Sequence, residues 1–270
     1  MGDFERGGLE QLIAHFNFVL NNIKMQFQKF FYLVPILIVL YLLVITLLPI
    51  VYSAQLFKTQ PPKNSSPVEL EINSNQVKTL NVAVIGDSTA IGQGTDSIQE
   101  SFSYQYLLQS NSLRNLKIKY TNYAETGARI KDILDKQLIF EPVDLVFVSI
   151  GANDVTHLTA QKDFESSVAS LTSKLQNLAK QVIWINIPDF ISVPVFWPPL
   201  NYLTSNQAQK LNTITQKQVS KFNQIKIIDV YELARQPFLD NPDKYFSKDK
   251  FHPSKDGYQI WVDLITKAEG

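Results

Sequence analysis

The stretch Val82–Ser88, Val-Ala-Val-Ile-Gly-Asp-Ser, joins a short apolar run to a turn of small and polar residues. Four apolar residues in a row, three of them β-branched, are typical of a strand that is buried on both faces. A glycine just after such a strand permits a tight turn into a helix, which exposes the next side chain and points backbone N–H groups at it. The stretch therefore predicts a strand that presents Ser88 at its carboxyl end, as a nucleophile, as a helix N-cap or as part of a phosphate-binding turn. A P-loop is excluded because no Gly-Lys-Ser/Thr string follows.

The same change from an apolar run to a helical period repeats along the chain. The apolar runs, rich in Val and Ile, are Val82–Ile85, Leu116–Tyr120, Val143–Ile150, Val182–Ile187 and Ile225–Val230. Stretches of helical period lie between and after them, at Phe102–Leu108, Ile130–Leu138, Phe164–Leu178, Ala208–Phe222 and Tyr258–Ala268. Alternating strands and helices predict an α/β fold with a mostly parallel sheet, helices on both faces and its chemistry at the carboxyl ends of the strands.

The N-terminal part of the chain has a different character. Residues 30–57 contain no charged side chain, and about 20 apolar residues suffice to cross a bilayer. We expect an uncleaved transmembrane helix here; a buried core helix and a cleaved signal peptide are the alternatives. Lys24 and Lys29 precede the run, and Lys58 and Lys63 follow it, so the positive-inside count is equal. Our expectation is an N-terminus inside and an extracytoplasmic domain.

The segments on either side of this run have their own patterns. Residues 1–29 include apolar side chains at steps of three and four, which predict an amphipathic helix that lies on the membrane or packs on a partner or on the domain. Residues 58–79 are polar and contain three prolines, which is typical of a linker. Within it, Val68–Ile72 alternates and permits a short strand. The expected organisation is thus 1–29, 30–57, 58–79 and a domain over 80–270.

Composition excludes several kinds of site. Lys plus Arg and Asp plus Glu number 25 each, so net charge gives no reason to expect a nucleic-acid partner. The sequence has no cysteine, which excludes thiol catalysis, disulfides and zinc–thiolate sites. We expect neither a metal nor an organic cofactor, and the sequence does not indicate an oligomeric state.

Two further strings supply chemistry that complements Ser88. Gly151-Ala152-Asn153-Asp154 follows the third strand and offers a neutral amide donor at the cleft. Asp249-Lys250-Phe251-His252-Pro253 precedes the last helix, and its spacing lets an acid orient a histidine. Serine, amide, acid and histidine are the parts of an acyl-transfer site. A surface loop with a lone histidine is the alternative interpretation of the last string.

Asp154–His157 is a rival because it has the same Asp-x-x-His spacing and also follows a strand. Spacing does not separate the two histidines. His252 is favoured because Pro253 biases its backbone towards an extended conformation and a helix follows. Asn153 has a different function in the competing loop.

Taken together, the strings resemble the SGNH/GDSL hydrolase superfamily over roughly residues 80–268. The four residues that name it match Ser88, Gly127, Asn153 and His252, with Asp249 three residues before the histidine. The resemblance implies a flavodoxin-like three-layer sandwich with five parallel strands, and esterase chemistry through an acyl-serine. It also implies an oxyanion hole made by the backbone N–H groups of Ser88 and Gly127 and by the Asn153 side chain.

The sequence departs from the family pattern at Thr89, where the GDSL string has leucine. On this basis we expect a membrane-anchored esterase that cleaves a glycan O-acetyl, lipid or small ester. An O-acyltransferase on an envelope glycan and a catalytically silent binding module are the alternatives. Phe196 and Trp197, in a proline-rich connection, either line the acyl pocket or touch lipid, or else fill a gap over the sheet.

Overall fold

The structure is a computed structural model that describes residues 3–56 and 67–269. The chain forms two compact units, Met1–Ile50 and Val51–Gly270.

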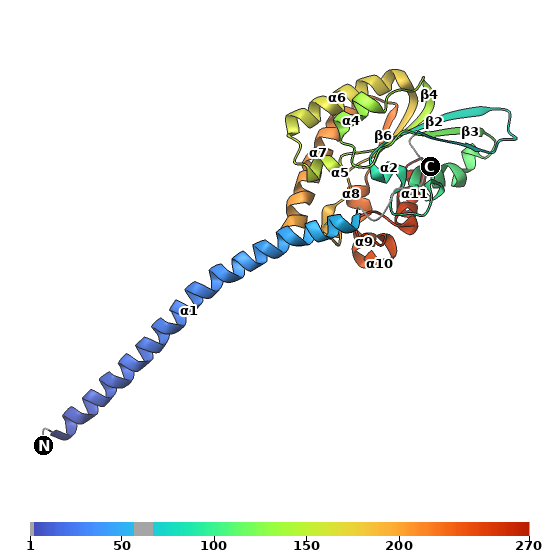
Figure 1. Cartoon of the computed structure of the whole chain (residues 1–270). Coiled ribbons are helices and arrows are strands. Elements are labelled where there is room, and N and C mark those ends of the chain that lie inside the picture. The colour runs from blue at the N-terminus through green and yellow to red at the C-terminus, as the bar shows by residue number, and fades with distance from the viewer. Residues whose placement is uncertain (1–2, 57–66, 270) are drawn as a thin grey trace. The chain divides into compact units, whose positions relative to one another are not determined.

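The first unit belongs to α1, a continuous helix over Asp3–Leu56 (Figure 1). Among the described residues, His15–Leu47 is the one segment long and apolar enough to cross a bilayer, with a mean hydropathy of 2.8 in its most apolar window and nothing buried there. A signal sequence has the same character, so α1 is a candidate anchor. No helix end occurs near residue 30, so the amphipathic and apolar segments predicted from the sequence are parts of one helix.

The second unit is built on a six-stranded sheet with the order β1-β3-β2-β4-β5-β6. The strands are β1 (Val68–Ile72), β2 (Thr79–Gly86), β3 (Lys117–Asn122), β4 (Val143–Ser149), β5 (Ala179–Ile185) and β6 (Ile225–Ile228). Five are parallel, in the flavodoxin order, and β1 pairs antiparallel with β3 at the edge.

The predicted five-stranded parallel sheet therefore lacked one strand. Strand β1 lies inside the segment predicted as a linker, and its side chains alternate between partly buried and exposed until Ile72. An edge strand needs only one apolar face, which a run of five alternating residues provides. Residues 57–66 of the predicted linker lie outside the described part of the chain.

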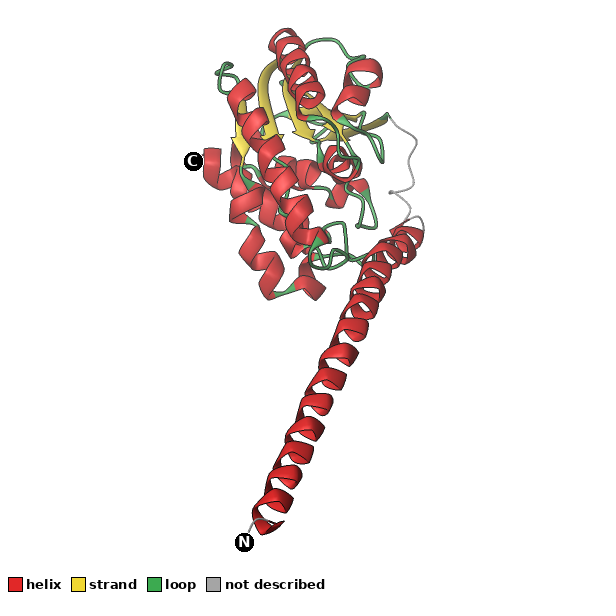
Figure 2. Ribbon diagram, turned by 90° about the vertical axis from the view of Figure 1, so that its left-hand side faces the viewer, coloured by secondary structure: helices red, strands yellow, loops and turns green. Residues whose placement is uncertain are grey.

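Helices cover both faces of the sheet (Figures 1 and 2). The longer ones are α3 (Phe102–Gln109), α4 (Ile130–Lys136), α6 (Gln161–Leu178), α7 (Leu200–Val219) and α11 (Lys255–Glu269). Short helices cap the strand ends or fill connections: α2 (Ser88–Ile91), α5 (Ala152–Thr156), α8 (Val230–Leu233), α9 (Arg235–Asp240), α10 (Pro242–Tyr245), and the 3₁₀ turns η1 (Ile98–Glu100), η2 (Asn111–Leu113) and η3 (Phe190–Ser192). Figure 1 shows α4, α6 and α7 on one side of the sheet and α11 on the other.

The core explains why the central strands are apolar throughout. The carboxyl-terminal halves of β2 and β4 are buried on both faces. On one face, Phe147 of β4 meets the rings of Phe102 and Tyr106 from α3, with edge-to-face centroid distances of 6.0 and 5.7 Å. Phe102 in turn packs on Trp261 of α11. This layer fixes the sheet beneath the turns that follow the strands.

Strand β2 lies between β3 and β4. The chain therefore passes from β2 to β3 on one side of it and then crosses to β4 on the other side. Ligands of open α/β sheets bind at such a switch point, outside the carboxyl ends of the strands. Ser88 follows β2, Gly127 follows β3 and Asn153 follows β4. Residues that follow three neighbouring strands thus meet at the carboxyl ends of those strands.

Candidate active site

Ser88 lies in a turn that only glycine permits. Gly86 has a φ of +147°, and a Cβ there would lie 2.0 Å from the Ser149 carbonyl oxygen of β4. Without a side chain, β2 and β4 can approach at their ends, and the Asp87 N–H donates to that same oxygen at 3.0 Å. Ser88 is then the first residue of α2, so its N–H has no partner inside the helix.

Polar side chains hold this turn in place by hydrogen bonds. The Asp87 carboxylate caps α2 by accepting from the Thr89 N–H at 2.9 Å and from the Thr89 hydroxyl at 2.7 Å. The same hydroxyl lies 2.7 Å from the Ser149 Oγ, so the threonine that replaces the family's leucine is satisfied although it is buried. Gln137 of the loop after α4 bonds both the N–H and the carbonyl of Gly86, at 2.8 and 3.0 Å.

Ser88, His252 and Asp249 form one hydrogen-bonded series. The His252 Nε2 lies 2.9 Å from the Ser88 Oγ, and its Nδ1 lies 2.7 Å from the Asp249 Oδ2. All three are buried, at 7, 4 and 1% exposed. Serine and histidine are 164 positions apart in the sequence, and the fold brings them into contact.

The loop that contains His252 is shaped around the Asp249 carboxylate. Lys250 takes a left-handed φ of +58°, which turns the chain back on itself. As a result the Asp249 Oδ1 accepts the N–H groups of Phe251 and His252, each at 2.8 Å, and the Ser247 hydroxyl. Burial alone raises the pKa of Asp249, but the contacts with His252 and these N–H donors outweigh it and lower the pKa below its usual range. The carboxylate is therefore charged, as orienting a histidine requires.

A second glycine lets the histidine loop approach the serine turn. A Cβ on Gly94 would lie 2.4 Å from the Pro253 carbonyl oxygen and 2.9 Å from the His252 Cβ. The Tyr258 hydroxyl of α11 donates to the Gln93 carbonyl at 2.8 Å and joins the same two segments. The positive φ of Gly94 and its contact with the His252 loop have no signature in the local sequence.

The loop that contains Gly127 is bonded to α5, which contains Asn153. The Asn153 Nδ2 donates to the Ala128 carbonyl at 3.0 Å, which orients the amide and leaves its second N–H for a ligand. The buried Asp154 accepts the Ile130 N–H at 3.0 Å. Gly127 has a φ of +80°, and a Cβ there would meet open space within 4 Å. Gly127 is thus exposed, with open space beside its Cα.

The rival pair does not form. The exposed His157 turns its Nδ1 to the Asn153 carbonyl at 2.8 Å, while Asp154 points inward to the start of α4. The two side chains of this Asp-x-x-His string therefore serve different neighbours.

Asp87 is also buried, but its carboxylate is hydrogen-bonded to Thr89 and not to a histidine. Burial raises the pKa of its carboxyl to about 6, and the hydrogen bonds from Thr89 offset only part of that effect. Among the described residues, no cluster of three or more His, Asp or Glu side chains is placed to hold a metal.

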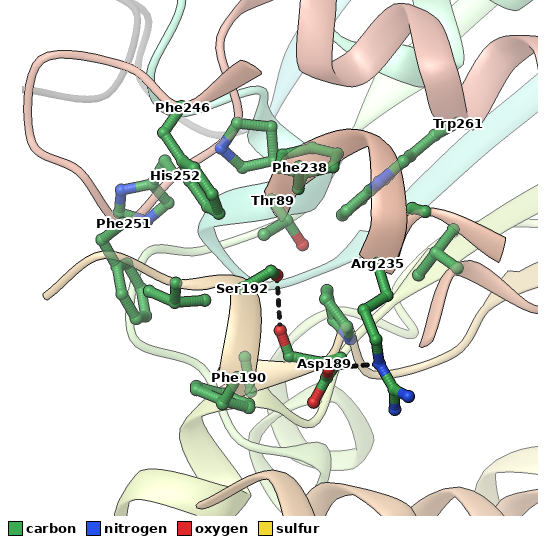
Figure 3. A pocket seen from close by; sticks show the side chains of 16 residues that line it. Thr89, Asp189, Phe190, Ser192, Arg235, Phe238, Phe246, Phe251, His252 and Trp261 are labelled. Atoms are coloured by element: carbon green, nitrogen blue, oxygen red, sulfur yellow. Dashed lines mark hydrogen bonds and ion pairs between the residues drawn. The ribbon is translucent and has the colours of Figure 1, made fainter. Parts of the chain in front are cut away.

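An apolar cavity of about 50 Å³ lies beside the histidine (Figure 3). Its walls come from α2, from the connection after β5, from α8 and α9, and from the segment that leads to His252. They include Thr89, Val193, Phe238, Phe246 and Phe251. At its base the Arg235 Nε lies 2.5 Å from the Asp189 carboxylate. Of the aromatic pair singled out from the sequence, Phe196 packs edge-on against Phe190 and Phe251, whereas Trp197 is 51% exposed. Phe196 thus fills a gap, and Trp197 does not.

The comparison with known families matches this geometry. Residues 84–260, more than half of the chain, match the model of the GDSL-like Lipase/Acylhydrolase family. The chain belongs to the GDSL-like lipase/acylhydrolase family. The family match includes Ser88, Gly127, Asn153, Asp249 and His252 and ends within α11.

Individual relatives are distant. The chain is 24% identical over 193 residues to the GDSL-like esterase Rv1075c of Mycobacterium tuberculosis, a match that covers 70% of this chain and 61% of that protein. Among solved structures, Axe2, an acetylxylan esterase from Geobacillus stearothermophilus, superposes with a TM-score of 0.53 at 18% identity over 72% of this chain and 96% of its own. LAE5, an α/β hydrolase from the metagenome of Lake Arreo, gives 0.53 at 14% identity over 73 and 97%. These two likenesses establish the fold.

Proposed function

We propose that this GDSL-family protein is a membrane-anchored serine esterase in which Ser88 is the nucleophile, His252 the general base and Asp249 the orienting acid. The observation that supports this most strongly is the hydrogen-bonded series from the Ser88 Oγ through His252 to the Asp249 carboxylate. Nucleophile and base lie within hydrogen-bond reach, and the base is itself oriented by a charged group, which is the arrangement that activates a serine.

In the first step the Ser88 Oγ bonds to the ester carbonyl carbon while its proton passes to the His252 Nε2. The imidazolium that forms is stabilised by Asp249, whose lowered pKa keeps it ionised at neutral pH. The tetrahedral intermediate then collapses, the bond to the alcohol oxygen breaks, and the His252 proton passes to the departing alcohol. Water, deprotonated by His252, attacks the acyl-serine in the same way and releases the acid.

The negative oxygen of each intermediate is held by the Ser88 and Gly127 N–H groups and by the Asn153 amide. This assignment is supported by the start of α2 at Ser88, the open space at Gly127 and the bond that orients Asn153. Neutral donors fixed in advance stabilise the developing charge without reorganising, and each contributes a factor of roughly 10²–10³ to turnover.

The cavity beside His252 indicates the size of the acyl group. A water molecule needs about 10–15 Å³ of such space, so 50 Å³ accommodates only a few non-hydrogen atoms. Its apolar walls favour a hydrocarbon group over a charged one. We therefore propose short acyl esters, with an O-acetyl group on a glycan or a small ester as the substrate class, and not long-chain lipids. The name of the structural neighbour Axe2, an acetylxylan esterase, is consistent with an acetyl group.

The anchor in this proposal is α1, with the N-terminus inside and the domain extracytoplasmic. Its support is the exposed apolar segment His15–Leu47, which at 1.5 Å per residue is about 50 Å long and exceeds the roughly 30 Å of a bilayer core. Because the natural sequence offers no cysteine, single cysteines placed at Gly7 and at Lys267 can be labelled with an impermeant maleimide on intact cells. Labelling at Lys267→Cys and not at Gly7→Cys is expected; the reverse pattern contradicts the orientation.

The activity is tested by hydrolysis of a series of p-nitrophenyl esters by the full chain in detergent. Rates should be highest for acetate to butyrate and fall for longer chains, and Ser88→Ala should be inactive. Adding acceptor alcohols distinguishes a transferase: if new ester forms faster than acid is released, the acyl-serine serves transfer and the hydrolase proposal is wrong.

A further inference from the structure

A surface segment beside the active site lacks charge altogether. Residues 190–209 contain no Asp, Glu, Lys, Arg or His, in a chain of which 19% of residues are charged. The segment runs from η3 through the proline-rich connection into the first half of α7. It is not wholly buried: Trp197, Tyr202 and Leu203 are 51, 59 and 63% exposed. Exposed tryptophan, tyrosine and leucine without a nearby charge in the sequence set this surface apart.

The three exposed side chains are held outward by the structure around them. The Leu200 and Asn201 N–H groups donate to the Trp197 carbonyl, so the tryptophan is fixed to the start of α7. In the first turns of that helix, Asn201, Thr204 and Ser205 are buried. Tyr202 and Leu203, which lie between these buried positions, therefore face solvent.

The segment is coupled to the site through aromatic rings. Phe196, next to Trp197, packs on Phe251 with a centroid distance of 6.0 Å, and Phe251 packs on the His252 ring at 4.9 Å. Val193 of the same connection lines the cavity shown in Figure 3. Trp197 is thus joined to the His252 ring through two packed aromatic side chains.

We propose that Trp197, Tyr202 and Leu203 form a docking surface for the lipid–water interface of the membrane in which α1 is anchored. Tryptophan and tyrosine are enriched at that interface because their rings are apolar and their polar tips stay wet. Only eleven residues separate the end of α1 from the start of β1, a reach of at most about 40 Å. The domain is therefore joined to α1 by a short segment. The proposal rests on the anchor proposed above and adds a defined face of the domain.

The sequence provides its own probe. Of the three tryptophans, Trp184 and Trp261 are each 1% exposed, so Trp197 dominates any quenching from outside. The full chain is reconstituted at one copy per nanodisc, with lipids brominated along the upper acyl chain or with unbrominated lipids. Emission of the natural chain should fall with bromolipid and resist iodide in the buffer, and Trp197→Phe should show no such loss.

Two controls separate docking from mere tethering. Ile139 is 69% exposed and precedes β4, at the amino ends of the parallel strands, whereas Trp197 follows β5, at their carboxyl ends. A tryptophan introduced by Ile139→Trp in the Trp197→Phe background should be quenched by iodide and not by bromolipid. Leu203→Asp should restore iodide access to Trp197, whereas Ile139→Asp should not.

Quenching of Trp197 by iodide with no effect of bromolipid overturns the proposal. Protection from both quenchers also overturns it, because protein then covers the surface. Resistance of the chain to carbonate extraction reports the anchor separately, and ester hydrolysis in detergent reports the enzyme. An anchored, active chain whose Trp197 is open to iodide would leave the proposed function intact and reject the docking surface alone.

Discussion

Asp154–His157 and Asp249–His252 share one spacing, and the fold uses them differently. In the first, the residues lie in and at the end of the short helix α5, so Asp154 points inward to the Ile130 N–H while His157 turns to the Asn153 carbonyl. In the second, Lys250 turns the backbone in a left-handed conformation and brings acid and imidazole to 2.7 Å. The backbone between two residues, more than their separation, decides whether their side chains meet.

The largest expected difference between the two loops is in turnover. His252→Ala should lower kcat/KM for p-nitrophenyl acetate by on the order of 10⁴ or more, because Ser88 loses its base. The double variant with Ser88→Ala should be no worse than either single variant, since the residues act as one unit. His157→Ala is the matched control and should remain close to the natural rate. A loss at His157 equal to that at His252 would reverse the assignment.

The acids of the two Asp-x-x-His strings should also differ in their effect on turnover. Asp249→Asn should reduce kcat by roughly 10³–10⁴, because the amide no longer fixes the imidazole tautomer or stabilises its charge. Asp154→Asn should cost far less, since Asp154 accepts the Ile130 N–H and does not orient a histidine. Steady-state kinetics of both variants, with circular dichroism to verify folding, make the comparison. Equal losses would mean that the Asp249 contact is structural.

The outlines of the fold were predictable because strong patterns act locally. Every parallel strand was expected within a few residues, since buried strands are rich in Val and Ile. Strand β1 was only permitted, because five alternating residues in a proline-containing segment are a weak signal. Helix α7 begins at Leu200, before the predicted Ala208, because its first turns bury Asn201 and Thr204, whose polar character hides the helical period.

Some residues of the candidate site were predictable from the sequence, and others were not. Ser88, Asn153 and His252 follow recognisable strings, so the sequence singles them out. The bracing by Gln137, which bonds Gly86 from 51 positions away, depends on tertiary packing and has no local signature. The open space at Gly127 and the close approach at Gly94 likewise arise only from the assembled loops.

A smaller effect on turnover is expected at Asn153, which lies just before the acid of the first loop. Asn153→Ala should lower kcat by roughly 10²–10³ with little change in KM, because the amide acts on the transition state. The variant also loses the bond that the Asn153 amide donates to the Ala128 carbonyl, so its urea midpoint is measured beside its kcat to verify that the fold is kept. An unchanged kcat in the alanine variant would remove Asn153 from the oxyanion hole.

The smallest effect on turnover is expected at Asp87, whose role is in the turn. Its pKa is raised by burial to about 6, so the folded state holds the proton more tightly than the unfolded one. This raised pKa adds to the free energy of unfolding below about pH 4, and the contribution is lost as the pH rises through 6. At 1.36 kcal/mol per pKa unit, the contribution is on the order of 3 kcal/mol. Asp87→Asn should flatten the fall of the urea midpoint between pH 4 and 7. The same slope in both proteins would contradict the raised pKa.

The most direct test of the site is the reaction of the full chain with a fluorophosphonate, followed by peptide mass spectrometry. One adduct is expected, on Ser88. It should form in the natural chain and in His157→Ala, and it should be lost or slowed by orders of magnitude in His252→Ala. An adduct on another residue, or equally fast labelling of Ser88 without His252, would contradict it.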